Sequence, residues 1–130
     1  MDQPSLILIT EDEILIQDIV ADGLREAGFE VATADHGAEA MTLLEAETEK
    51  IRALVTDVQL GKGPDGWDVA RRARELVPDM PVVYVTADSA GDWASKGVPN
   101  SVLIQKPFAN AQLITAVSSL LNDLDAHRAG

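Results

Sequence analysis

Short apolar runs of strand length alternate along the chain with segments of helical period. The runs cover 5–9, 30–34, 53–57, 81–85 and 101–104, and most are apolar at nearly every position. Strands with two apolar faces are typical of parallel sheets that helices cover on both sides. The alternation therefore predicts an α/β fold in which five helices wrap a five-stranded, doubly wound parallel sheet through right-handed crossovers.

The expected helices carry apolar stripes with a spacing of three to four residues. The stripes are Ile16, Ile19, Val20, Leu24 and Ala27; Trp67, Ala70, Ala73, Leu76 and Val77; and Leu113, Ile114, Val117, Leu120, Leu121 and Leu124. Gly28 is placed to end the first helix, and Asp35 is placed to cap the second. The fourth helix, within 88–96, has the weakest pattern because Gly91 interrupts it.

The length and composition are those of one globular domain. A chain of 130 residues with 46% hydrophobic and 25% charged residues buries a sizeable core. We expect a single domain over 1–130, with a folded core of about 5–125. Residues 1–4 lack the basic and apolar regions of a secretory signal, and no apolar run approaches a membrane span. The expected location is the cytoplasm, with no membrane contact.

The charge and the cysteine content exclude several kinds of site. The chain has no cysteine, which rules out disulfides and thiolate metal sites. The net charge of -12 argues against nucleic acid as a partner, because phosphate binding requires clustered Lys and Arg. An acidic surface instead favours metal cations or basic partners.

Polar residues follow the apolar runs at the carboxyl ends of four predicted strands. Glu11 and Asp12 come after the first strand, Asp57 ends the third, Thr86 follows the fourth and Lys106 follows the fifth. The carboxyl ends of parallel strands share one edge, and ligands of such sheets bind at that edge. We therefore expect these five side chains to lie close together.

Three carboxylates at one edge need a cation among them if all are to stay ionised. Mg²⁺ prefers hard oxygen ligands and often bridges carboxylates to a phosphate, whereas zinc would require His or Cys. Beside such an ion, Asp57 is a plausible nucleophile towards phosphorus, since carboxylates form aspartyl phosphates. Lys106 would supply a positive charge, and Thr86 a hydroxyl, for phosphoryl oxygens.

Four motifs resemble the receiver domain of two-component response regulators. They are "TEDE" at 10–13, "VTDVQL" at 55–60, "YVTAD" at 84–88 and "IQKPF" at 104–108, in the order and spacing of that family over essentially the whole chain. The resemblance implies a flavodoxin-like receiver fold and a Mg²⁺ ion held by Glu11, Asp12, Asp57 and the main-chain carbonyl of Gln59. It also implies that Asp57 accepts the phosphoryl group beside Thr86 and Lys106, with a cis peptide bond between Lys106 and Pro107. Glu13 is expected only to start a helix.

The resemblance also implies a function in signalling. A histidine kinase or a histidine phosphotransfer protein would present phosphohistidine to Asp57. The product would bind a downstream protein at the face of the fourth and fifth elements, or would act as a phosphate shuttle or sink. The domain would not be an enzyme, since it assists only its own phosphorylation and dephosphorylation.

Two alternatives remain open at this point. One is a binding module that works without phosphorylation and retains the acids as scaffold. The other is a magnesium-dependent phosphatase that uses an aspartyl phosphate. Such phosphatases place a second acid two residues after the nucleophile as a general acid, and here that position is Gln59. This favours a phospho-acceptor over an enzyme that turns over substrate.

The sequence departs from the family pattern in two places. The family's aromatic switch residue lies three positions before the lysine, and here that position is Leu103. Tyr84 shares a strand face with Thr86 by the period of two, which suggests the hypothesis that Tyr84 replaces the switch. The loop "GKGPDG" at 61–66 has Gly61 where the family usually carries a proline, four residues after the aspartate, and it is one residue longer than the family's loop. Trp93, in the weak fourth helix, is a candidate partner anchor or part of the core.

Overall fold

The computed structural model describes residues 4–129. Residues 1–3 and residue 130 lie outside the described residues. The structure therefore does not describe most of the N-terminal stretch 1–4, in which no secretory signal was expected. The elements are β1 (Leu6–Thr10), α1 (Ile14–Glu26), β2 (Glu30–Ala34), α2 (Gly37–Ala46), β3 (Ile51–Asp57), α3 (Gly66–Leu76), β4 (Val82–Thr86), the 3-10 helix η1 (Ala90–Asp92), α4 (Trp93–Lys96), β5 (Val102–Gln105) and α5 (Asn110–Ala129).

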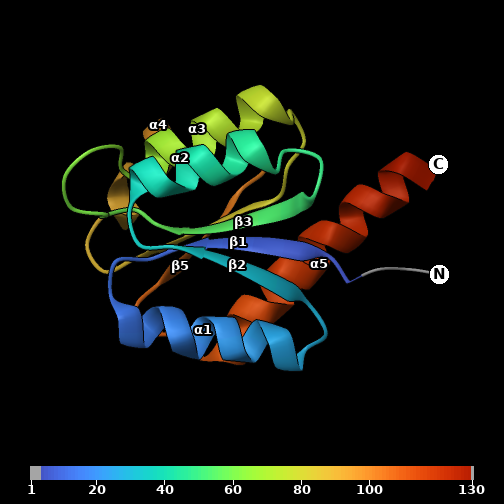
Figure 1. Ribbon diagram of the computed structural model, residues 1–130, viewed down its shortest axis with the longest axis horizontal. Coiled ribbons are helices and arrows are strands. Elements are labelled where there is room, and N and C mark those ends of the chain that lie inside the picture. Colours follow the sequence, from blue (N-terminus) through green and yellow to red (C-terminus); the bar gives the residue numbers. More distant parts are fainter. Residues whose placement is uncertain (1–3, 130) are drawn as a thin grey trace.

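The five strands form one parallel sheet in the order β2-β1-β3-β4-β5 (Figure 1). This is the predicted doubly wound fold, and each strand lies within two residues of its predicted position. The winding reverses between β1 and β3, since β1 leads to β2 on one side and β3 leads to β4 and β5 on the other. The carboxyl ends of β1 and β3 therefore flank the switch point, where such folds place their ligands.

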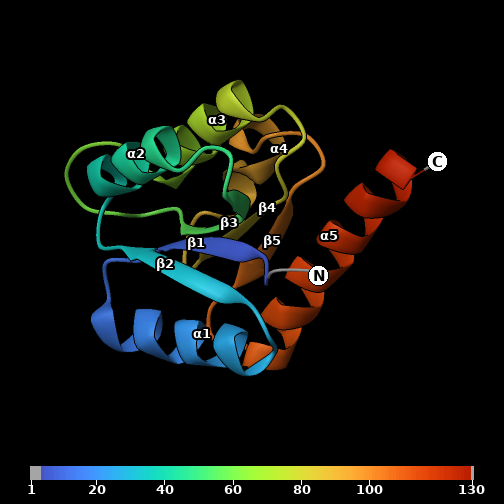
Figure 2. The same cartoon turned by 45° about the vertical axis from the view of Figure 1, so that its right-hand side comes forward.

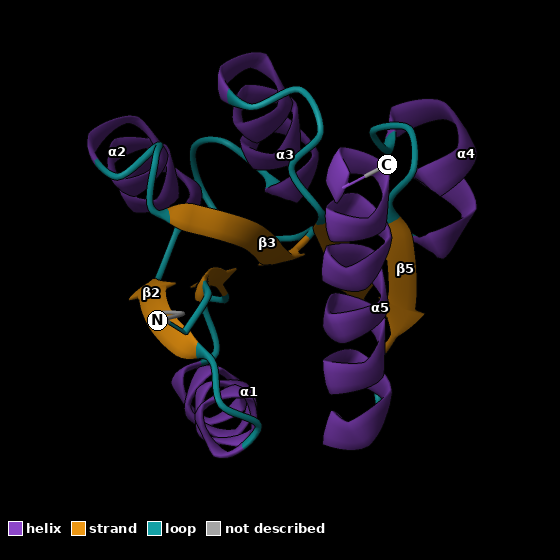
Figure 3. Ribbon diagram, turned by 90° about the vertical axis from the view of Figure 1, so that its right-hand side faces the viewer, coloured by secondary structure: helices purple, strands orange, loops and turns teal. Residues whose placement is uncertain are grey.

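Helices cover both faces of the sheet, as the apolar strands require. The helices α2, α3 and α4 lie on one face, and α1 and α5 lie on the other (Figures 1 and 3). The side chains form two separate cores, one led by Leu8, Leu54 and Tyr84 and the other by Ile9 and Val55. Alternate residues of each central strand enter opposite cores, so the strands are buried on both faces.

The buried face of α1 differs from the predicted stripe. Gln17, Val20, Ala21 and Leu24 are buried, whereas Ile19 is 58% exposed. The helix is turned about its axis so that an amide faces the interior and an isoleucine faces solvent. Periodicity finds a helix, but its rotation is set by the elements against which it packs.

The start of α2 also corrects a prediction. The N-cap is His36, whose Nδ1 accepts a hydrogen bond from the main-chain N–H of Glu39 at 3.2 Å. Asp35 lies one residue earlier, and its own N–H donates to the Glu39 carboxylate at 2.6 Å. At the end of α1 the prediction is confirmed, because Gly28 follows the C-cap with a φ of +100°, which favours glycine.

The fourth helical segment is short, as its weak pattern indicated. It consists of η1 followed by the single turn α4, and Trp93 at the start of that turn donates from Nε1 to the Ser101 hydroxyl at 2.9 Å. By contrast, α5 is long and extends past the sheet (Figure 2). Among the helices of residues 4–129, none combines the length and apolar character that a membrane span requires.

Candidate functional site

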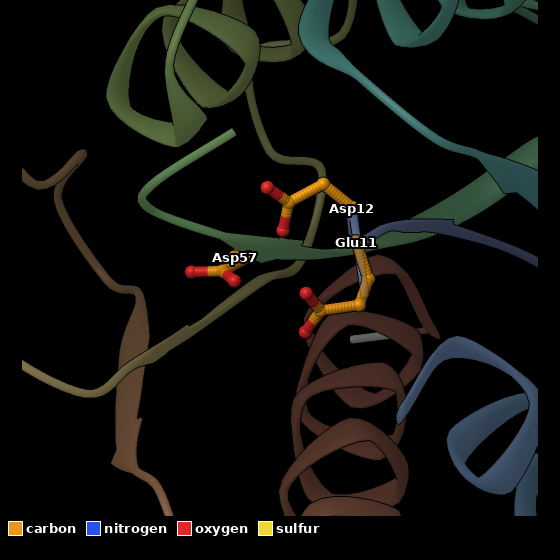
Figure 4. A group of neighbouring side chains, drawn as sticks. All are labelled: Glu11, Asp12 and Asp57. Atoms are coloured by element: carbon orange, nitrogen blue, oxygen red, sulfur yellow. The ribbon is translucent and has the colours of Figure 1, made fainter. Parts of the chain in front are cut away.

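Three carboxylates meet at the carboxyl edge of the sheet. Glu11 and Asp12 lie in the loop after β1, and Asp57 is the last residue of β3. Each offers an oxygen, and these oxygens lie within 4.8 Å of one another. Figure 4 shows all three side chains turned to the same side. Glu11 and Asp57 are only 2% and 5% exposed, whereas Asp12 is exposed. The predicted acidic cluster is therefore present.

Lys106 enters this cluster from the loop after β5. Its Nζ lies 2.9 Å from Glu11 Oε1 and 2.9 Å from Asp57 Oδ2, and 3.5 Å from Glu13 Oε1. The peptide bond between Lys106 and Pro107 is cis, in agreement with the resemblance. Lys106 thus neutralises part of the acidic charge and lies beside the predicted phospho-acceptor.

The main chain around Asp57 holds its carboxylate in place. The N–H of Gln59 donates to Asp57 Oδ1 at 3.1 Å. The N–H of Gly66 donates to the carbonyl of Val58 at 2.8 Å, and a Cβ on Gly66 would lie only 2.1 Å from the carbonyl oxygen of Asp57. Only glycine allows α3 to begin this close to the end of β3. That the carbonyl of Gln59 binds a metal stays a prediction.

The titration of Glu11 and Lys106 reflects their burial together. Burial first, and then the hydrogen bond and negative charge of Asp57, raise the pKa of Glu11 from 4.5 to about 7, although Lys106 acts in the opposite direction. Burial alone would lower the pKa of Lys106, but its hydrogen bonds to Asp57 and Glu11 outweigh burial and raise it. The positive charge of one lysine therefore does not fully offset the negative charge and the burial of the two acids.

Thr86 lies one residue beyond the pairing of Asp57 with Val85, at the same edge of the sheet. Its Oγ1 accepts hydrogen bonds from the N–H groups of Ser89 at 2.8 Å and Asp88 at 3.3 Å. Its carbonyl accepts from the N–H of Lys106 at 2.8 Å. A hydroxyl with both lone pairs engaged has its proton left to donate. Thr86 thus connects the loop after β4 to the cluster.

The donor set fits magnesium. Its side-chain donors are three carboxylates, of which Glu11 and Asp57 are buried, and burial raises the pKa of Glu11. A small divalent cation with hard oxygen preference suits such a set and would relieve the uncompensated charge. Within residues 4–129 the three acids Glu11, Asp12 and Asp57 are the group whose geometry allows such an ion.

The raised pKa of Glu11 predicts an unusual pH dependence of stability. Between pH 4.5 and about 7 the folded protein holds a proton on Glu11 that the unfolded chain has released. The free energy of unfolding of the metal-free protein should therefore fall as pH rises through this window, by about 3 kcal/mol. Urea denaturation in EDTA at several pH values measures this slope.

The Glu11→Gln variant isolates the effect of this carboxyl from other titrations. A neutral amide cannot ionise, so the variant should lose this fall and be the more stable protein at pH 8. Parallel profiles for the variant and the wild type would show that burial of Glu11 does not govern the slope.

Tyr84 and Leu103 lie opposite each other on β4 and β5. Leu103 is half-buried, and Tyr84 is completely buried. The Tyr84 hydroxyl accepts from the N–H of Val98 at 3.0 Å, and its ring lies 4.7 Å from the ring of Trp67. Tyr84 is thus fixed at both ends. Its role in place of the aromatic switch stays a hypothesis, and it requires the bond to Val98 to break.

Two residues at the site were not found from the sequence. Glu13 starts α1 as its N-cap residue, as expected, but its carboxylate also lies 3.5 Å from Lys106 Nζ and its N–H donates to Glu11 Oε2 at 3.2 Å. Gln17 is buried below the loop and donates to the carbonyl of Glu11 at 3.1 Å. Its spacing from Val20 and Leu24 was the available signal, since it places an amide on the same helix face as two core residues.

Comparison with known proteins agrees with this geometry. The family model described as "Response regulator receiver domain" matches residues 7–118. The chain is 37% identical over 119 residues to the probable transcriptional regulatory protein SilR of Salmonella typhimurium, a match that covers 88% of this chain and 50% of SilR. It is 30% identical over 117 residues to the response regulator receiver protein CpdR of Brucella abortus, which covers 88% of this chain and 95% of CpdR.

The chain thus spans about half the length of SilR and nearly all of CpdR. Among solved structures, a response regulator receiver protein from Sinorhizobium medicae superposes with a TM-score of 0.89 at 45% identity. That match covers 92% of this chain and 95% of the other.

Proposed function

The chain belongs to the response regulator receiver domain family of two-component systems, whose members interact with histidine kinases or phosphotransfer proteins, and we propose that Asp57 is its phospho-acceptor. The observation that carries this proposal is the Asp57 carboxylate, held at the switch point between Lys106 and two further acids. In this function the domain is a signalling acceptor and not an enzyme that turns over a separate substrate.

The proposed step is transfer of a phosphoryl group from phosphohistidine. A carboxylate oxygen of Asp57 forms a bond to phosphorus while the bond from phosphorus to the imidazole nitrogen breaks. The imidazole keeps the electron pair of that bond and then takes a proton. Such transfers need mainly alignment and charge compensation from the protein, which are what the residues around Asp57 provide.

The surrounding residues have separate tasks in this proposal. Glu11, Asp12, Asp57 and the carbonyl of Gln59 would hold Mg²⁺, which supplies positive charge to the carboxylates and to the transferred group. Lys106 lies within hydrogen-bond distance of Asp57 and would bind a phosphoryl oxygen as a point charge. Thr86 would donate its hydroxyl proton to another phosphoryl oxygen.

Thr86 and Lys106 would couple phosphorylation of Asp57 to the conformation of the neighbouring loops. The Thr86 hydroxyl binds the N–H groups that begin the segment leading to α4, and Lys106 continues from β5. A phosphoryl group that binds both residues would favour one arrangement of this segment over another, which is a population shift. We propose that the downstream partner binds the face formed by α4, β5 and α5. A role as a phosphate shuttle or sink would use the same phosphoryl transfer to Asp57.

The phosphohistidine donor would dock on an apolar surface beside the site. This surface consists of Ile14, Leu15 and Ile19 on α1, which are exposed. Ile19 also lines an apolar pocket of about 440 Å³ that it shares with Lys106 and Phe108. Because the pocket includes Lys106, a partner bound there would be adjacent to Asp57. Exposed contiguous apolar side chains commonly mark protein contacts.

A charge on this surface should impair phosphoryl transfer from a protein donor but not from a small-molecule donor. Leu15 is 79% exposed, so Leu15→Asp should fold normally yet place a carboxylate in the apolar contact. We expect the phosphotransfer rate from the histidine kinase most active on the wild type to fall by at least about tenfold, as at an interface hot spot. The rate with acetyl phosphate should not change, because that donor needs no docking surface.

Ala38→Asp provides the matched control, because it adds the same charge to an exposed position of α2, on the other face of the sheet. Equal losses in both variants, or a loss with acetyl phosphate, would argue against docking at α1.

The direct test of the proposed function is incubation with acetyl phosphate, with and without MgCl₂, followed by intact mass measurement. We expect one phosphoryl group per chain, dependent on magnesium and mapped to Asp57 by reduction of the acyl phosphate and peptide sequencing. Steady release of phosphate from many small substrates would instead support the phosphatase alternative. No mass gain under any condition would support a binding module that works without phosphorylation.

A further inference from the structure

Gln17 is a polar residue at a core position of α1. It is 6% exposed and shares the inner face of the helix with Val20, Ala21 and Leu24. Side chains at such positions are ordinarily apolar, because a buried amide loses its bonds to water. The amide is retained at no net cost only if it finds hydrogen-bond partners inside the protein.

The partners of Gln17 lie in two separate loops. Its Nε2 donates to the carbonyl of Glu11 at 3.1 Å and to Asp35 Oδ1 at 2.9 Å, and the carbonyl of Ala34 lies at 3.4 Å. The N–H of Glu11 also donates to the carbonyl of Ala34 at 3.1 Å. The main chain of Glu11 is therefore tied on its N–H side to the end of β2 and on its carbonyl side to Gln17.

This arrangement bears on the acidic cluster because Glu11 and Asp12 are consecutive. The main-chain carbonyl that Gln17 binds belongs to the peptide that joins these two residues. Its orientation sets the directions in which both carboxylates leave the loop. Mutual repulsion pushes the two carboxylates apart. A site for a small cation requires its ligand oxygens to lie within about half an ångström of their proper positions.

We propose that Gln17 is a positioning residue for the acidic cluster, and that Asp35 at the start of the β2–α2 turn holds the Gln17 amide in the required orientation. The chain of contacts runs from Asp35 through Gln17 to the peptide between Glu11 and Asp12. The inference rests on the proposed function, since it concerns the same magnesium site. It adds two residues that are not among the proposed ligands of the ion or of the phosphoryl group.

The test is a titration of the metal-free protein with MgCl₂, followed by the amide chemical shifts of residues 11–13 and 57–59. Gln17→Met keeps the side-chain volume but removes the donor, and we expect magnesium affinity about tenfold weaker, as for other groups that orient metal ligands. Asp35→Ala should cause a smaller loss. The loss in the double variant should equal that of Gln17→Met alone, because Asp35 acts through Gln17.

Two controls separate positioning from charge and from general stability. Asp35→Asn removes the charge but keeps the acceptor oxygen, so its affinity should match the wild type. Val20→Ala opens the core of the same helix and should lower the free energy of unfolding without weakening magnesium binding. Since Asp35 is exposed, its two variants test the inference even if Gln17→Met does not fold.

Unchanged affinity in Gln17→Met, or independent additive losses in the double variant, would overturn the positioning role. Equal affinities of Asp35→Ala and Asp35→Asn would do the same. If the wild-type amides near the acids do not respond to MgCl₂ at all, the metal site in the proposed function fails, and this inference fails with it.

Discussion

Asp57→Asn is expected to abolish phosphoryl uptake from acetyl phosphate while the fold is retained. The amide has the size of the carboxylate, and its oxygen can still accept from the N–H of Gln59. It has neither the negative charge nor the nucleophilic oxygen that attack on phosphorus requires. Intact mass measurement after incubation with MgCl₂ should show the phosphorylated species for the wild type and none for the variant.

Glu13→Gln is the matched control for Asp57→Asn. It also converts a carboxylate near Lys106 to an amide, but Glu13 is exposed and lies 3.5 Å from the lysine Nζ, compared with 2.9 Å for Asp57. We expect this control to take up the phosphoryl group. If Asp57→Asn is still modified at the wild-type level, another residue is the acceptor and the proposed chemistry is wrong.

The sheet and the placement of the site could be predicted from the sequence for a physical reason. Strands buried on both faces must be apolar throughout, which makes them stand out from amphipathic helices without knowledge of the tertiary structure. Once the strands are parallel, their carboxyl ends share an edge. The proximity of Glu11 and Asp57 follows from that, although 45 residues separate them in the sequence.

The details that could not be predicted depend on tertiary contacts. Ile19 was predicted to face the core but is exposed, and Gln17, outside the predicted stripe, is buried, because packing against the sheet and α5 decides how α1 is turned. The cap of α2 is His36 and not Asp35, although aspartate is the more common cap, because the path of the turn places the His36 side chain next to the N–H of Glu39. Local preference favoured Asp35 as the cap and Ile19 in the core, and the surrounding structure overrode it in both cases.

Lys106→Met is expected to lower the free energy of unfolding of the metal-free protein by about 3 kcal/mol at pH 8. Methionine has an apolar side chain of similar length, so the variant retains the packing but leaves the buried acids Glu11 and Asp57 without the lysine's positive charge. The loss should be smaller at pH 6, because Glu11, with a pKa of about 7, then carries a proton. Urea denaturation in EDTA at the two pH values measures both effects.

Addition of MgCl₂ should recover much of this loss, because a divalent cation bound by the acids replaces the missing positive charge and stabilises only the folded state. Lys62→Met is the control, since Lys62 is an exposed lysine in the loop after β3, and its removal should change stability little. A loss in Lys106→Met that is independent of both pH and magnesium would mean that the lysine contributes packing alone. In that case the charge balance among the three acids and Lys106 would not be the force that holds the site together.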